Sequence, residues 1–147
     1  MRSARLEMAL ESGAFVLPPT GDVVVLGPQA GDDLSALPKA QVVVLTGFKP
    51  DFDHFQRLGY RMDVTAATAA VICLPRAKAE ALALIAHAFS LVPAGAPVLV
   101  DGQKTDGPEA VLKLARAAGI AHGEVISKAH GKAYVLTAGA APADWAA

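Results

Sequence analysis

Continuous apolar runs alternate along the chain with segments in which apolar residues have helical spacing. The apolar runs cover residues 22–26, 41–46, 70–74 and 97–100, and their unbroken, β-branched character is typical of strands buried on both faces of a sheet. Helical segments are predicted at 3–12, 50–58, 78–92 and 108–118, with a short capped helix at 32–37 and a weak element at 60–64. This alternation predicts an α/β fold with a mainly parallel sheet and helices on both faces.

The chain ends in a different pattern. Residues 124–128 and 132–137 have strand character and flank Ala129-His130-Gly131, which predicts an antiparallel hairpin with Gly131 in its turn. The predicted fold is therefore a Rossmann-like three-layer sandwich, mostly parallel, with a C-terminal antiparallel hairpin. In the longest helical segment, Lys78 and Leu82 belong to the predicted apolar stripe.

The strand–helix–strand unit of residues 71–107 carries the most suggestive polar residues. Cations and amides follow both strands, and the carboxyl ends of parallel strands meet at one edge of a sheet, where ligands bind. Such a basic patch could contact phosphate groups, but a solvated helix start and an ordinary turn explain the same residues equally well. The candidate RNA-contact residues are Arg76, Lys78, Gln103 and Lys104, with Lys128 and Lys132 of the hairpin.

The first strand lacks the expected cofactor loop. Gly27-Pro28-Gln29-Ala30-Gly31 has the wrong spacing for a dinucleotide or S-adenosylmethionine fingerprint, Pro28 removes a backbone donor, and Asp32 and Asp33 would repel a phosphate. The second strand ends in Thr46-Gly47, without an acid for a ribose. We therefore expect a plain turn in a degenerate copy of the fold that binds no cofactor.

The residue pattern gives little support for acid–base catalysis, metal binding or a reactive thiol. Asp101, Lys104 and Asp106 make a weak acid–base set because no histidine or second carboxylate cluster is near them in sequence. The four histidines lack metal-ligand spacing, so we expect no metal site. Cys73 lies in a predicted buried strand and is expected to be a structural thiol.

Composition narrows the class of protein further. The 147 residues suffice for one domain, and the net charge of −1 means that a basic surface would have to arise from local clustering. A single cysteine excludes a disulfide framework and favours a reducing cytoplasm. No segment has the pattern of a signal peptide or a membrane span, so we expect a cytoplasmic protein without membrane contact.

Two turns and the hairpin together resemble the N-terminal domain of the "methyltransferase small" family, whose best-known members are small-subunit ribosomal RNA guanine-N2 methyltransferases. The turns are Pro75-Arg76-Ala77-Lys78 and Gly102-Gln103-Lys104-Thr105-Asp106-Gly107. They are similar to the family's Pro-Lys/Arg-x-Lys and Gly-Glu/Gln-x-x-x-Gly turns, separated by one helix. The resemblance is clearest over residues 70–137, and Pro142-Ala143-Asp144-Trp145 resembles the family's interdomain linker.

This resemblance implies a methyltransferase-type fold in a two-domain enzyme whose C-terminal half binds S-adenosylmethionine and carries an Asn-Pro-Pro-Phe/Tyr motif. Neither feature occurs in this chain. Residues 1–137 would then be a degenerate, non-catalytic N-terminal domain and residues 138–147 the start of a linker to an absent catalytic domain. The implied partners are that domain and ribosomal RNA. Two alternatives stay open: a stand-alone ligand-binding or enzymatic domain using loops 75–78 and 101–107, and a structural docking domain that forms a homodimer.

Overall fold

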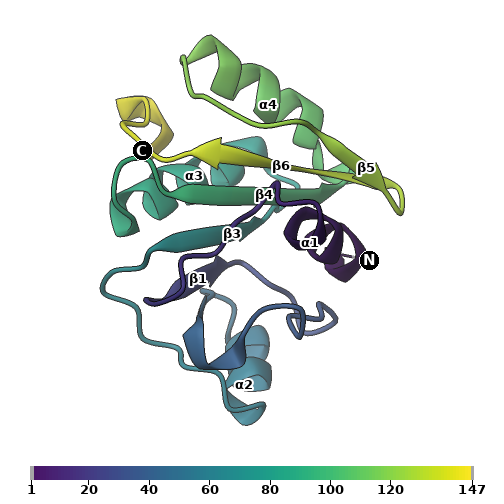
Figure 1. Ribbon diagram of the computed structural model, residues 1–147, viewed down its shortest axis with the longest axis vertical. Helices are drawn as coiled ribbons and strands as arrows, with labels where there is room; N and C mark the ends of the chain where they lie inside the picture. Colours follow the sequence, from purple (N-terminus) through teal and green to yellow (C-terminus); the bar gives the residue numbers. More distant parts are fainter. Residues whose placement is uncertain (1, 147) are drawn as a thin grey trace.

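The computed structural model describes residues 2–146 and contains one twisted sheet (Figure 1). Its strand order is β2-β1-β3-β4-β6-β5. The first four strands of that order are parallel to one another, and β6 pairs antiparallel with β4 on one side and with β5 on the other. The strands are β1 (Val23–Leu26), β2 (Val42–Leu45), β3 (Ala69–Cys73), β4 (Pro97–Gln103), β5 (Ile126–Lys128) and β6 (Gly131–Thr137). The predicted mainly parallel sheet with a C-terminal antiparallel hairpin is confirmed.

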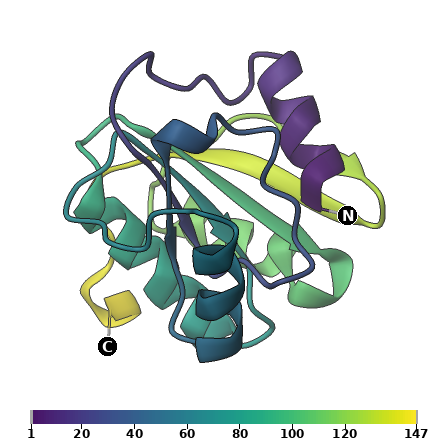
Figure 2. The same cartoon turned by 90° about the horizontal axis from the view of Figure 1, so that it is seen from below.

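Helices cover both faces of the sheet. They are α1 (Arg2–Glu11), α2 (Lys49–Arg57), α3 (Lys78–Leu91) and α4 (Pro108–Ala117). Because side chains alternate along a strand, Val24 of β1 packs in the cluster with α3 and α4, whereas Val25 packs with α1 and α2. Figure 2 shows α1 and α4 on opposite sides of the sheet. The predicted three-layer sandwich is confirmed.

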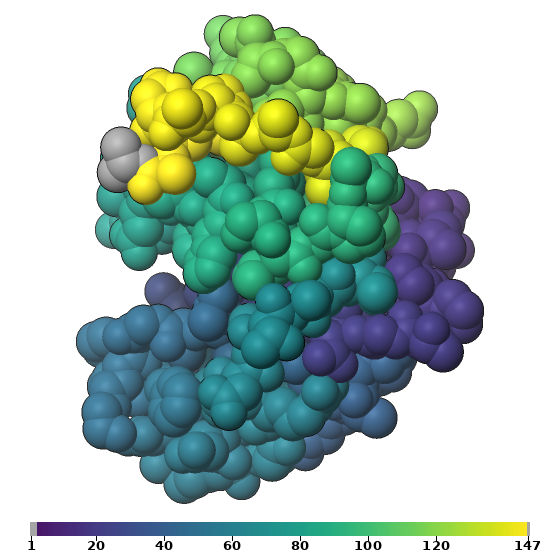
Figure 3. All heavy atoms as spheres, turned by 90° about the vertical axis from the view of Figure 1, so that its left-hand side faces the viewer, coloured from purple at the N-terminus to yellow at the C-terminus, as the bar shows by residue number. Residues whose placement is uncertain are grey.

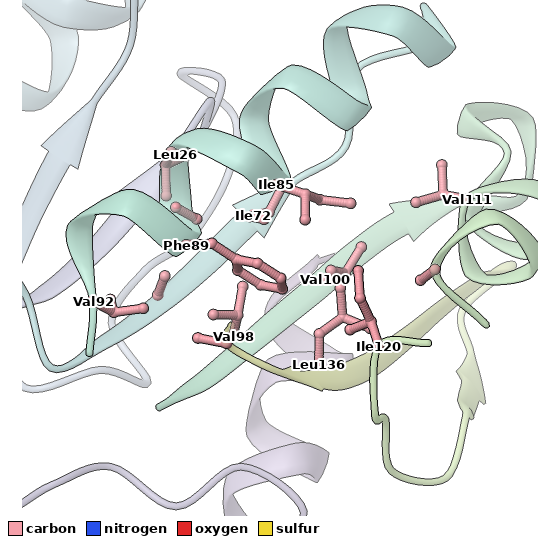
Figure 4. Close-up of a cluster of buried hydrophobic side chains, with 14 of the residues drawn as sticks. Leu26, Ile72, Ile85, Phe89, Val92, Val98, Val100, Val111, Ile120 and Leu136 are labelled. Atoms are coloured by element: carbon pink, nitrogen blue, oxygen red, sulfur yellow. The ribbon is translucent and has the colours of Figure 1, made fainter. Parts of the chain in front are cut away.

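The larger hydrophobic cluster lies between the sheet and helices α3 and α4 (Figure 4). Ile85 and Phe89 of α3 pack over Val98 and Val100 of β4, and all four side chains are buried. The apolar stripe of α3 begins at Ala81, because Lys78 is exposed. The prediction that Lys78 belongs to this stripe is therefore wrong.

Three further local expectations differ from the structure. Residues 32–37 are irregular and contain a turn instead of a helix, because the Asp32 and Asp33 side chains accept bonds from the backbone N–H groups of Gln29 and Ser35. Strand β4 continues beyond residue 100 to Gln103, since its last residues pair with β6. Gly131 is the first residue of β6 and lies outside the turn. The weak element at 60–64 contributes one bridge, between Arg61 and Val43 on the outer side of β2.

The C-terminal residues pack against the domain. A short 3-10 helix, η3 (Ala143–Ala146), lies on α3, and Trp145 is only 7% exposed within the larger cluster. In Figure 3 the yellow C-terminal residues lie directly against the teal residues of the α3 region. The assignment of residues 138–147 to an interdomain linker stays a prediction, but residues 138–146 include part of the core of this domain.

No helix within residues 2–146 is both long and apolar enough to span a bilayer.

Candidate functional site

A large hollow lies at the carboxyl ends of β1, β2 and β3. It has a volume of about 1030 Å³ and is lined by the loops after these three strands and by one side of α3. The strand order reverses between β1 and β3, and such a switch point is where open α/β sheets bind ligands. From the sequence, the working edge was expected further along, after β3 and β4. The signal for this hollow was the predicted parallel pairing, because the carboxyl ends of all parallel strands lie at one edge.

The loop after β1 is held by carboxylates of the chain itself. The backbone N–H of Gln29 donates to Asp32 Oδ2 at 2.8 Å, and the N–H of Ala30 donates to Asp51 Oδ1 at 3.0 Å. Pro28 has no N–H to offer, and no helix follows β1 before β2 in the described chain apart from the three-residue 3-10 turn η1 (Lys39–Gln41). Of the two features that bind anions in a glycine loop, the N–H groups of Gln29 and Ala30 are thus engaged by internal bonds, and no α-helix begins directly after this loop in the described chain.

The loops after β3 and β4 do open side by side, as predicted. Arg76 and Gln103 both line a hollow of about 410 Å³, and Asp32 and Asp106 line it with them. Arg76 is exposed and Gln103 is half-buried. The two acids offset the cation, so this hollow is less basic than the sequence pattern suggested.

The remaining candidates divide between two places. Lys78 is exposed at the first position of α3. Lys104, Lys128 and Lys132 instead line hollows beside the β5–β6 hairpin and the start of α4. The structure therefore places Lys104 with the two hairpin lysines, and Arg76 with Gln103.

Asp101 belongs to a buried ion pair. Arg5 of α1 donates from Nε to Asp101 Oδ1 at 2.5 Å and from Nη2 to Oδ2 at 3.1 Å, and the arginine side chain is fully buried. Its Nη1 donates to the carbonyl oxygen of Lys128 at 2.9 Å. Asp101 is a member of the weak acid–base set considered above, but its buried carboxylate instead links α1, β4 and the hairpin.

The hairpin tip is fixed from two sides. Ala129 and His130 adopt positive φ angles of 52° and 60°, as a two-residue turn of right-handed twist requires. The side-chain amide of Gln103, in the orientation that satisfies its neighbours, donates to the carbonyls of both residues at 3.2 Å. The N–H of Lys104 donates to the carbonyl oxygen of His130 at 2.8 Å. Gln103 thus has a structural role in addition to its place at the edge.

Tyr134 of β6 lies beneath the start of α4. Its hydroxyl donates to the carbonyl oxygen of Pro108 at 2.9 Å, and burial raises the pKa of the phenol well above its usual value of 10.0. The phenol is consequently neutral at physiological pH and serves to hold α4 on the sheet.

Across the described residues, no three His, Cys, Asp or Glu side chains gather as metal ligands would. Cys73 is buried in β3, as predicted. His87 and His130 are exposed, and His54 and His122 are half-buried.

Comparison with known proteins identifies the fold. No protein-family model and no curated protein matches the sequence. Among solved structures, the chain is similar to the 16S rRNA N2 G1207 methyltransferase RsmC of T. thermophilus, in complex with AdoMet and guanosine. The TM-score is 0.70 at 20% identity, over 94% of this chain and 40% of the other.

Two further solved structures are similar. TrmN from Thermus thermophilus has a TM-score of 0.60 at 18% identity, over 90% of this chain and 48% of that one. An rRNA methylase from Streptococcus thermophilus has a TM-score of 0.61 at 12% identity, over 94% of this chain and 96% of that one. The chain thus spans less than half the length of RsmC and TrmN, and nearly the whole length of the rRNA methylase.

These similarities, together with the sheet order, show that the chain has the Rossmann-like α/β fold of the methyltransferases.

Proposed function

We propose that this chain is a non-catalytic, methyltransferase-like N-terminal domain of an S-adenosylmethionine-dependent RNA methyltransferase acting on ribosomal RNA. The observation that carries this proposal is the loop after β1, where Asp32 and Asp51 accept bonds from N–H groups in the position at which the fold normally presents them to a ligand. A fold retained without open cofactor donors serves for support or for positioning of substrate. The catalytic half of the protein would bind the cofactor.

The length comparison agrees with this role. The chain spans 40% of RsmC, a methyltransferase that acts on 16S rRNA, which leaves room for a second domain in a protein of that size. In the proposed arrangement, the exposed cations beside the sheet and the hairpin hold RNA while the second domain methylates it. The net charge of the whole chain is only −1, so attraction for RNA depends on the local clustering of these cations.

A second function has one specific observation in its favour. The hollow of about 1030 Å³ at the ends of β1, β2 and β3 is large enough for a small ligand, and an rRNA methylase of similar length shares the fold. A stand-alone ligand-binding or enzymatic domain would use this hollow. Saturable binding of a nucleotide or of S-adenosylmethionine there would favour this second function over the first.

The test of RNA contact is a charge-reversal series. We expect Arg76→Glu/Lys104→Glu to weaken binding of a short, fluorescein-labelled single-stranded RNA by about tenfold, because each cation that contacts a phosphate contributes through counterion release. Fluorescence anisotropy with the chain, and with the intact enzyme where a catalytic half is attached, measures the affinity. The matched control is Lys49→Glu/Arg57→Glu on α2, which makes the same change of charge at two exposed residues outside the candidate set. Equal affinity of the two variants would overturn the assignment of Arg76 and Lys104.

A further inference from the structure

A concave surface lies between α4 and the β5–β6 hairpin, apart from the hollow at the ends of β1, β2 and β3. It consists of two adjoining hollows of about 660 Å³ and 300 Å³, which have Lys104, Glu109, Ser127 and Lys132 in common. Figure 1 shows α4 lying over the hairpin at the end of the molecule opposite α2. We call this surface the α4–hairpin groove.

The groove concentrates positive charge in a nearly neutral protein. Of the 13 lysines and arginines in the chain, five line it, and Glu109 is the only acid among the described lining residues. The five cations are Lys104, Lys113, Arg116, Lys128 and Lys132. A cleft with one sign of charge focuses the field on a ligand of the opposite sign.

Helix α4 supplies two cations that the sequence pattern did not single out. Lys113 and Arg116 are three residues apart, so they are neighbours on one helix face, and both are exposed. Arg116 Nε donates to His122 Nε2 at 2.9 Å, and the other ring nitrogen of His122 lies 2.8 Å from the carbonyl oxygen of Gly123. This bond uses one of the five guanidinium N–H groups, and it orients the side chain before any ligand arrives.

The hairpin supplies the opposite wall. Lys132 Nζ donates to Ser127 Oγ at 2.8 Å and lies 3.5 Å from Glu109 Oε1. The Glu109 side chain is 71% exposed, so this pair is weak and a phosphate can replace the carboxylate. Lys128 and Lys104 extend the same wall toward the hairpin tip.

The floor of the groove is apolar. Pro108, Leu112 and Tyr134 line it and are buried, and Val125 is 37% exposed at its side. Of these apolar residues, Val125 alone is exposed and can pack against a sugar or the edge of a base, while the cations along both walls bind the phosphates. The volume of the larger hollow falls within the range of small-molecule sites, so it is sufficient for a nucleotide unit.

We infer that the α4–hairpin groove binds the phosphodiester backbone of single-stranded RNA, with Lys113 and Arg116 on one wall and Lys132 and Lys128 on the other. This inference rests on the proposed function and names the surface that performs its RNA contact. Glu109 acts as a counter-ion that RNA phosphates replace.

The test is Lys113→Glu/Arg116→Glu, compared by anisotropy on the same labelled single-stranded RNA with the α2 control Lys49→Glu/Arg57→Glu. We expect affinity to fall by about tenfold or more in the α4 variant alone. The dependence of log affinity on log salt concentration should also become shallower by about 1.4, which is two phosphate contacts at about 0.7 each for a single strand. Glu109→Gln should change affinity in the opposite direction, with binding about twofold tighter. Circular dichroism verifies that each variant is folded.

The outcomes separate this inference from the function on which it rests. A loss of affinity in the α4 variant, with the shallower salt slope, supports the groove. If Arg76→Glu alone, which leaves every cation of the groove in place, weakens binding and the α4 variant does not, RNA contact stands and the groove is wrong. If the unmodified chain does not bind RNA, or if no variant differs from the α2 control, both are wrong. Binding of an acidic peptide in the groove with no RNA binding would likewise overturn the inference.

Discussion

Arg5→Ala is expected to reduce the free energy of unfolding by about 3–5 kcal/mol, the usual cost of breaking a buried ion pair from one side. The substitution removes both guanidinium bonds to Asp101 and leaves that carboxylate in a place where only 2% of the residue is exposed. It also removes the bond to the carbonyl oxygen of Lys128. A loss of this size is a large part of the stability of a small domain. Urea unfolding measures it, with the fluorescence of Trp145, the single tryptophan, as the probe.

The matched control is Arg61→Ala. Arg61 also pairs with an acid, at 2.8 Å from Asp22, but the two side chains are 49% and 32% exposed. We expect Arg61→Ala to lower the free energy of unfolding by about 1 kcal/mol or less, as the loss of a surface ion pair usually does. The double variant Arg5→Ala/Asp101→Ala should be more stable than Arg5→Ala alone, because the buried charge is gone. If Arg5→Ala and Arg61→Ala had equal effects, α1 would not be joined to the sheet through this pair.

Gly131→Ala is expected to lower the free energy of unfolding by about 3 kcal/mol, at the upper end of the usual range for overpacking. A Cβ atom at Gly131 would overlap the guanidinium of Arg5 and the backbone carbonyl oxygen of Gly102. The carbonyl belongs to β4 and is held in the ladder with β6, so it cannot move away without disturbing the pairing. Urea unfolding with the same fluorescence probe measures the effect.

Gly139→Ala provides the comparison, because a Cβ atom at Gly139 has no neighbour within 4 Å. Its stability should be within about 0.5 kcal/mol of the unmodified chain. In the Arg5→Ala background, Gly131→Ala should cost less than it does alone, since one of the two overlaps has been removed. Additive effects of the two substitutions would show that Arg5 and Gly131 do not share this site.

The strands were predictable because a strand buried on both faces requires an unbroken apolar run, and such runs are visible locally. The Arg5–Asp101 pair was not predictable, because the partners are 96 positions apart and no local pattern links them. For the same reason Gly131 was predicted to be a turn residue. Glycine is required there because the guanidinium of Arg5, from the other end of the chain, leaves no room for a side chain.

The candidate site was predictable in part. The shared edge of the loops after β3 and β4 followed from parallel pairing, and the hollow lined by Arg76 and Gln103 agrees with it. Lys104 lies beside the hairpin because β4 continues to Gln103 and pairs there with β6. The sequence did not predict this continuation, because Asp101 and Gly102 are poor strand formers. The three-residue spacing of Lys113 and Arg116 is visible in the sequence. The sequence does not show that α4 lies over the hairpin, which is what brings these two cations into one hollow with Lys132.

The central proposal is that this chain does not bind the cofactor, and it is based on the bonds from the N–H groups of Gln29 and Ala30 to Asp32 and Asp51. Isothermal titration calorimetry of S-adenosylmethionine into the chain tests this claim most directly. We expect no saturable heat up to millimolar cofactor. Saturable binding of one cofactor per chain would contradict it.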